Sequence, residues 1–156
     1  MEVLNEQLLR AWQIHESKNF ALIDNVKQAG LECTLSTRGG RTVGQQLVHV
    51  HAVRLSMLEN MRKDLFESLP KVEREQGHDR KLLRKAFLAS GKAIEKLIKT
   101  TPDGKVKVFK GGLVTFIAYL IAHESHHRGG IVLTLKQAKQ PLKKEDYWKI
   151  WGWSKG

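Results

Sequence analysis

Two histidines, His123 and His127, stand four residues apart in an apolar stretch that has the periodicity of a helix. Residues at this spacing lie on one helix face, close enough for both imidazoles to hold a single metal ion. His126 lies about 100° away from His127 around the same helix, so it is a rival ligand that faces another direction. The spacing therefore predicts a metal site on this helix.

A third ligand must come from elsewhere in the chain, and His49 and His51 are the candidates. About 200° separates these two residues on a helical wheel, so only one of them can face the metal. His51 falls within the apolar arc of its segment, whereas His49 falls at the polar margin of that arc. The position on the wheel by itself favours His51.

Four segments with helical periodicity are expected to position these histidines, and a glycine or a proline follows each of them. Their apolar stripes run over residues 2–28, 43–65, 82–97 and 113–131, and the stop signals are Gly30, Pro70, Pro102 and Pro141. Thr42 is expected to cap the second helix, and His123 and His127 fall on the inward stripe of the fourth. Residues 106–109 alternate like a strand but are too few to found a sheet. The chain is therefore predicted to be all-α, with a single four-helix-bundle domain over residues 1–156.

Three of the four tryptophans lie within residues 147–153. Such a dense aromatic cluster is expected to cap the bundle or to make a dimer contact, because it is poorly suited to lie free in water.

The composition narrows the class of protein. The 156 residues are 41% hydrophobic, which suits one domain with a real core, and no apolar run is long enough to cross a bilayer. The N-terminal residues lack the features of a secretory signal, so we expect a cytoplasmic protein with no membrane contact. Cys33 is the only cysteine, which excludes an intramolecular disulfide and a thiolate-rich metal site. A metal must be held mainly by nitrogen and oxygen.

The formal net charge of +11 raises the question of a nucleic acid partner. The lysines are dispersed at spacings that suit solvated helix faces, and this favours a role in solubility.

Two stretches resemble the DinB-like (damage-inducible) superfamily: residues 41–54, which contain Leu47-Val-His49-Val, and residues 119–131, which contain His123 and His127. The resemblance covers most of the chain and includes the Trp-rich end. It implies a four-helix bundle, usually a homodimer, with a divalent metal that is often nickel or zinc. One histidine of the second helix and the His-x-x-x-His pair of the fourth would hold this metal. The helix-two ligand of that pattern follows a Leu-x-His-apolar sequence, so the resemblance implies His49, with His51 as its rival.

Three histidine ligands leave further coordination positions open to water or substrate, as in catalytic sites. The superfamily includes thiol-dependent S-transferases, so the resemblance implies either transfer of a low-molecular-weight thiol to a small-molecule electrophile or hydrolysis of a small molecule. Arg54 would suit a carboxylate on the thiol or substrate, and the alternative is an arginine paired with a nearby acid. Glu124 would suit a general base for hydrolysis.

Two other functions fit parts of the sequence. His123 to His127 satisfy the H-E-x-x-H signature of zinc peptidases, with Glu145 as a conceivable third ligand, but Leu133 occupies the place of the third histidine of the extended motif. Peptidases also need an edge strand and a cleft, which a helical chain does not offer. The other alternative is a basic, DNA-associated stress-response protein with a structural metal and no catalysis.

Overall fold

The computed structural model describes residues 2–36 and 38–153, and in these ranges all regular secondary structure is helical. The elements are α1 (Glu2–Asn25), α2 (Gln28–Leu31), α3 (Val43–Met61), α4 (Lys63–Phe66), the 3₁₀ helix η1 (Arg74–His78), α5 (Arg80–Lys99), α6 (Gly112–Gln137) and α7 (Lys144–Trp151). The predicted all-α class is confirmed, and residues 106–109 are irregular. In the described ranges, no helix combines the length and the apolar character that crossing a membrane requires.

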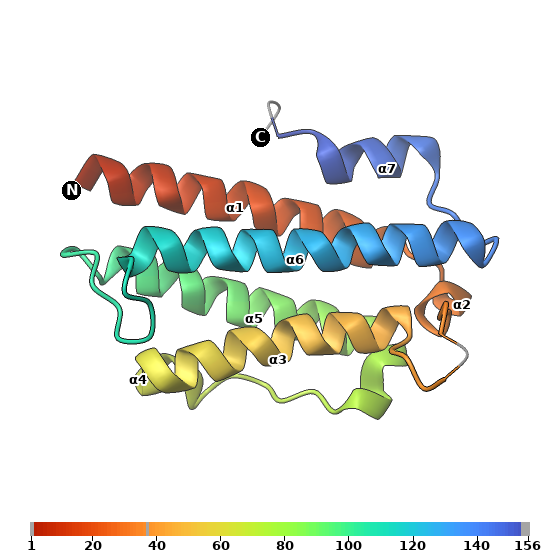
Figure 1. Ribbon diagram of the computed structural model, residues 1–156, viewed down its shortest axis with the longest axis horizontal. Helices are drawn as coiled ribbons and strands as arrows, with labels where there is room; N and C mark the ends of the chain where they lie inside the picture. The colour runs from red at the N-terminus through yellow and green to blue at the C-terminus, as the bar shows by residue number, and fades with distance from the viewer. Residues whose placement is uncertain (1, 37, 154–156) are drawn as a thin grey trace.

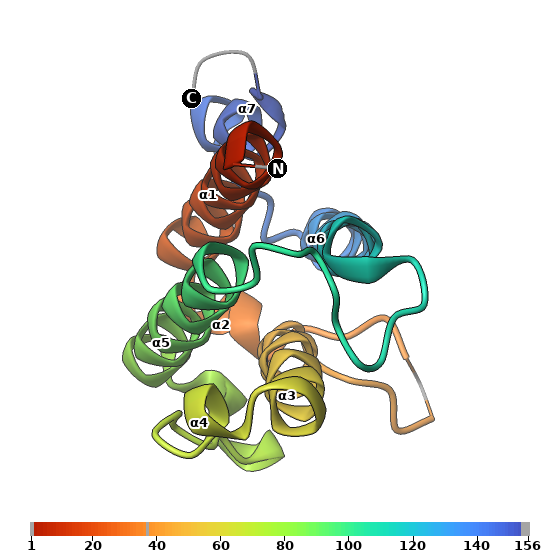
Figure 2. The same cartoon turned by 90° about the vertical axis from the view of Figure 1, so that its left-hand side faces the viewer.

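The four long helices α1, α3, α5 and α6 lie side by side (Figure 1) and occupy the four corners of the end view in Figure 2. Helices α1 and α3 each pack against both α5 and α6. The short helix α7 lies along α1, on the side away from α3. The site described below forms where α3 and α6 meet.

Helix α3 begins where the sequence predicts. The Thr42 hydroxyl accepts a hydrogen bond from the Gln45 amide, and the Gln45 side chain accepts one from the Thr42 amide. This reciprocal capping box satisfies two backbone donors that would otherwise be orphaned. Helix α3 ends at Met61, earlier than predicted, because the backbone of Arg62 leaves the helical region. Leu65 in α4 is again buried, so the apolar periodicity continues past the break and conceals it.

The start of α3 is also held by a close backbone contact. A Cβ atom added to Gly44 would come within 1.9 Å of the Gly77 carbonyl oxygen in η1. Only a glycine fits there, because any side chain would overlap backbone. The contact fixes η1 against the first turn of α3, and Gly44 lies five residues before His49.

The interior contains two hydrophobic clusters separated by buried polar side chains. On α6, Leu120 belongs to one cluster and Ile131 to the other, and Glu124 and Arg128 are buried between them. On α1, α3 and α5 as well, buried polar residues lie between residues of the two hydrophobic clusters. We call these residues the polar layer: His15, Glu16, Asn19, Arg54, Ser90, Glu124 and Arg128. It crosses the interior at the middle of all four long helices.

The Trp-rich tail packs differently from the prediction. Helix α7 joins the core through Ile150, which is 2% exposed, while Trp148, Trp151 and Trp153 are 61%, 48% and 39% exposed. The tryptophans therefore do not cap the bundled helices, because the aliphatic face of α7 is the face that meets α1. The dimer contact stays a prediction.

Candidate metal centre

Helices α3 and α6 bring three histidines together: His49, His123 and His127. Each offers one ring nitrogen, and these atoms all lie within 4.8 Å of one another. The ring centroids are 5.5 Å apart for His49 and His123, 5.0 Å for His49 and His127, and 4.7 Å for His123 and His127. All three side chains are half-buried. Bonds from zinc to histidine nitrogen are about 2.0–2.1 Å long, so nitrogens that lie within 4.8 Å of one another are close to the spacing that a shared ion would require.

The orientation of α6 differs from the sequence prediction. We expected His123 and His127 on the inward stripe, but the inward positions are held by the next residues in the chain, Glu124 and Arg128. The two histidines lie about 100° away, at the seam with α3. The apolar periodicity pointed to the histidines, whereas Glu124 and Arg128 are buried because they have partners in the interior.

The ring nitrogens fit a bound cation. The Nδ1 atom of His123 is buried and has no hydrogen-bond partner in the described structure. A buried polar atom without a partner costs free energy, and ligation would relieve that cost. The Nδ1 atom of His127 faces the Gln46 side-chain oxygen at 3.5 Å, which leaves its Nε2 available. The ring of Tyr119 stacks on that of His123, with centroids 5.8 Å apart.

The electrostatic environment keeps the three imidazoles neutral at pH 7. Burial lowers the pKa of His49, with a further contribution from the positive charge of Arg41. Burial also lowers the pKa of His123. The pKa of His127 falls to about 4, because burial and the neighbouring histidines both disfavour its charged form. Neutral imidazole is the form that binds a metal, so the site is ready to ligate at physiological pH.

The rival ligands lie elsewhere. His51 is 1% exposed, with Nδ1 at 3.2 Å from Ser90 Oγ and Nε2 at 2.7 Å from the Pro70 carbonyl. Both of its nitrogens are therefore occupied inside the core. His126 is exposed, beside His127 but outside the converging group. Glu145 lines a pocket between α1 and α7 with Ser17 and Lys18, so it is not brought to the histidines as a third ligand.

The buried His51 is expected to make the metal-free protein sensitive to mild acid. Burial lowers its pKa to about 4, against 6.5 when unfolded. The unfolded state thus binds the proton first, so the contribution is complete above pH 6.5 and is lost as pH falls toward 4. Urea unfolding between these pH values should give a shallower pH dependence in His51→Gln than in the wild type, by up to about 1.4 kcal/mol per pH unit. Identical slopes would contradict the prediction.

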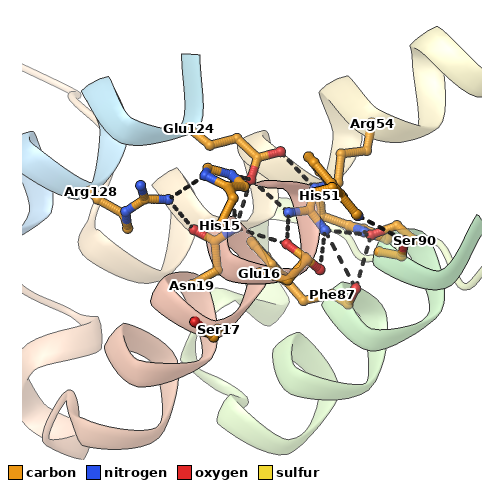
Figure 3. A network of polar contacts seen from close by, with 12 residues as sticks. His15, Glu16, Ser17, Asn19, His51, Arg54, Phe87, Ser90, Glu124 and Arg128 are labelled. Carbon is orange, nitrogen blue, oxygen red and sulfur yellow. Dashed lines mark hydrogen bonds and ion pairs between the residues drawn. The ribbon is translucent and has the colours of Figure 1, made fainter. Parts of the chain in front are cut away.

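Glu124 belongs to the polar layer (Figure 3) rather than to the open side of the histidine cluster. Its Oε1 accepts from Arg54 Nε at 2.7 Å, and its Oε2 accepts from Arg54 Nη2 at 2.6 Å and from Asn19 at 2.7 Å. Burial opposes its ionisation, but the charge and hydrogen bonds of Arg54, with those of His15, hold the pKa of Glu124 far below its usual range. A carboxylate so buried, paired and weakly basic does not suit a general base.

Arg54 is likewise committed to the interior. It is fully buried, and its guanidinium also binds Glu16 and donates to Ser90 Oγ at 3.3 Å. Its Cζ atom lies over the rings of Trp12 and Phe87, at 4.9 and 4.7 Å from their centroids. Arg54 is therefore not available for a substrate carboxylate. The structure instead shows the other alternative from the sequence analysis, in which Arg54 pairs with nearby acids, here Glu16 and Glu124.

The sequence reasoning missed most of this layer. Arg128 donates to Asn19 Oδ1 at 2.6 Å and lies 3.3 Å from His15 Nδ1, and neither Arg128 nor Asn19 was a candidate. One signal was present. Glu124 and Arg128 are the only charged residues between Gly112 and Leu135, and charges isolated in a long apolar helix are often paired inside.

One comparison with known proteins gave a match. The sequence model of the DinB family matches residues 1–148, which include the three histidines and the whole polar layer. The chain belongs to the DinB family. Searches of curated proteins and of solved structures found no match.

Proposed function

We propose that this chain is a divalent-metal-dependent enzyme with His49, His123 and His127 as its protein ligands on a four-helix bundle. The reaction class we propose is thiol-dependent S-transfer or hydrolysis of a small molecule. The observation that carries the proposal is the convergence of three neutral imidazoles from two helices within 4.8 Å. The unpartnered Nδ1 of His123 supports it.

The donor set favours particular metals and an open site. Imidazole nitrogens suit zinc and nickel. A divalent cation bound there would supply Lewis acidity, lowering the pKa of a thiol or water that it coordinates. The three histidines are half-buried rather than enclosed, so a small molecule can approach them. Three protein ligands with an accessible side are the pattern of catalytic rather than structural sites.

Arg41 takes the role that the sequence suggested for Arg54. It is exposed and directly precedes the cap of α3, and its positive charge contributes to the lowered pKa of both His49 and His127. A cation placed there would bind a carboxylate of the thiol or of its electrophilic partner. Gln46 and Tyr119 would orient the rings of His127 and His123.

The test begins with metal analysis of protein purified without a histidine tag. Zinc- and nickel-loaded protein is then screened with low-molecular-weight thiols and electrophiles. Two active thiols are then compared, one with a carboxylate and one without a charge. Arg41→Gln should raise KM for the carboxylate-bearing thiol about tenfold or more, because a charge-assisted contact contributes about 1.5–3 kcal/mol. The same variant should leave KM for an uncharged thiol unchanged. An equal effect on both thiols would contradict the role of Arg41, and a wild type that binds no metal would contradict the function.

The alternative function is a basic, DNA-associated protein with a structural metal. The net charge of +11 is the observation that favours it. This alternative predicts a DNA affinity that falls steeply with salt concentration. It also predicts a bound metal with a closed coordination shell and no catalytic turnover of any substrate. The accessible histidine cluster supports the enzyme instead.

A further inference from the structure

On α6, each of the two histidines of the metal site is followed directly by a buried charged residue. Glu124 directly follows His123, and Arg128 directly follows His127. Successive residues of a helix lie about 100° apart, so one pair faces the seam with α3 and the other faces the interior. Any rotation of α6 about its axis therefore moves both pairs together. The placement of the interior pair is therefore linked to the direction of the two imidazoles.

Glu124 connects the two helices that carry the histidines. Its two oxygens accept from Arg54 Nε at 2.7 Å and Arg54 Nη2 at 2.6 Å, which is a bidentate pair between α6 and α3. Arg54 lies five residues after His49 on α3. Fork-shaped pairs of this kind have strict geometry. This pair therefore fixes the offset and the rotation of α6 relative to the helix that carries His49.

Arg128 connects α6 to a different helix, α1. It donates to Asn19 Oδ1 of α1 at 2.6 Å, and its second contact, with Ser125 Oγ at 2.7 Å, lies within α6. Asn19 also donates to Glu124 at 2.7 Å, so the two interior anchors share a partner. Figure 3 shows these side chains from α1, α3, α5 and α6 converging. Because the contacts are directional and involve two other helices, α1 and α3, they restrict rotation more tightly than apolar packing does.

We infer that Arg54, Glu124 and Arg128 are positioning residues that hold His49, His123 and His127 together before a metal arrives. The inference rests on the proposed function, since it concerns the same three ligands. A ligand set held in place loses less conformational freedom on binding than a mobile one, and this raises affinity. The buried charges thus set the metal affinity and the coordination geometry without touching the metal.

The experiment compares the full-length wild type with Glu124→Gln, using Co²⁺ as the probe. Glutamine keeps the shape of the side chain but cannot accept the bidentate pair as an anion. Affinity is measured by titration, and the visible absorption of bound Co²⁺ reports the coordination geometry. The matched control is Leu97→Ala in α5, a helix that carries none of the three histidines, compared at a temperature where both variants are folded by circular dichroism.

Glu124→Gln should weaken Co²⁺ binding about tenfold or more and alter the absorption spectrum. Leu97→Ala should keep both at wild-type values despite its lower melting temperature. If Glu124→Gln does not fold, Arg128→Lys is measured in its place, because it keeps the charge and loses the forked contact. Wild-type affinity and spectrum in the folded variant would overturn the inference and leave the proposed function standing. A wild type that binds no Co²⁺, Zn²⁺ or Ni²⁺ would overturn both.

Discussion

Replacing any one of His49, His123 and His127 by alanine should abolish stoichiometric metal binding and leave the helices folded. Two imidazoles hold a divalent ion poorly, and the three side chains are half-buried rather than central to the core, so their loss should change stability little. Metal content after dialysis and circular dichroism spectra check the two halves of this prediction.

Two neighbouring histidines supply the controls. His126→Ala should retain the metal, because that side chain is exposed and lies outside the converging group. His51→Ala should retain most of the metal but lower the free energy of unfolding, because it leaves Ser90 and the Pro70 carbonyl without their partner. Full metal occupancy in His49→Ala, with loss in His51→Ala, would show that the position on the helical wheel was the better guide to the third ligand.

Among the substitutions considered, Arg54→Met should lower the free energy of unfolding most, by about 3–5 kcal/mol. Methionine keeps an unbranched apolar stem but lacks the guanidinium, so the carboxylates of Glu16 and Glu124 stay buried without their cation. Urea unfolding at pH 7 in metal-free protein gives the measurement.

Arg62→Met is the matched control, because it removes an arginine whose partner, Asp64, lies at the surface. Surface ion pairs contribute little to stability, so this variant should unfold close to the wild type. If the two variants lost the same free energy, the buried carboxylates of Glu16 and Glu124 would not depend on Arg54 for charge compensation.

We expect the buried polar layer to contribute to the specificity of the fold more than to its stability. Replacing a buried charge network by apolar residues is often neutral or stabilising, whereas removing one member is severe. Arg54 contacts side chains or backbone from α1, α5 and α6. Such a network has few alternative arrangements, so it selects one register for the four helices. Apolar packing alone would tolerate several.

The sequence alone was enough to predict the helical class, the cap at Thr42 and the identity of the three converging histidines. Each of these depends on local information. The capping box spans four residues, the pair His123 and His127 spans one helical turn, and His49 was identified by the short Leu-x-His-apolar pattern of a family resemblance. Local patterns are readable because helix geometry relates neighbouring residues in a fixed way.

Only the tertiary structure decided which face of α6 is buried and what Arg54 and Glu124 do. Glu124 and Arg54 are 70 residues apart in the chain, and Arg128 and Asn19 are 109 apart. A charged residue is buried only when a partner satisfies it, and that partner is set by how distant helices pack. Periodicity describes one helix at a time, so it assigned the inward face to the histidines. The partners on α1 and α3 turned α6 by one residue and placed the histidines at the seam.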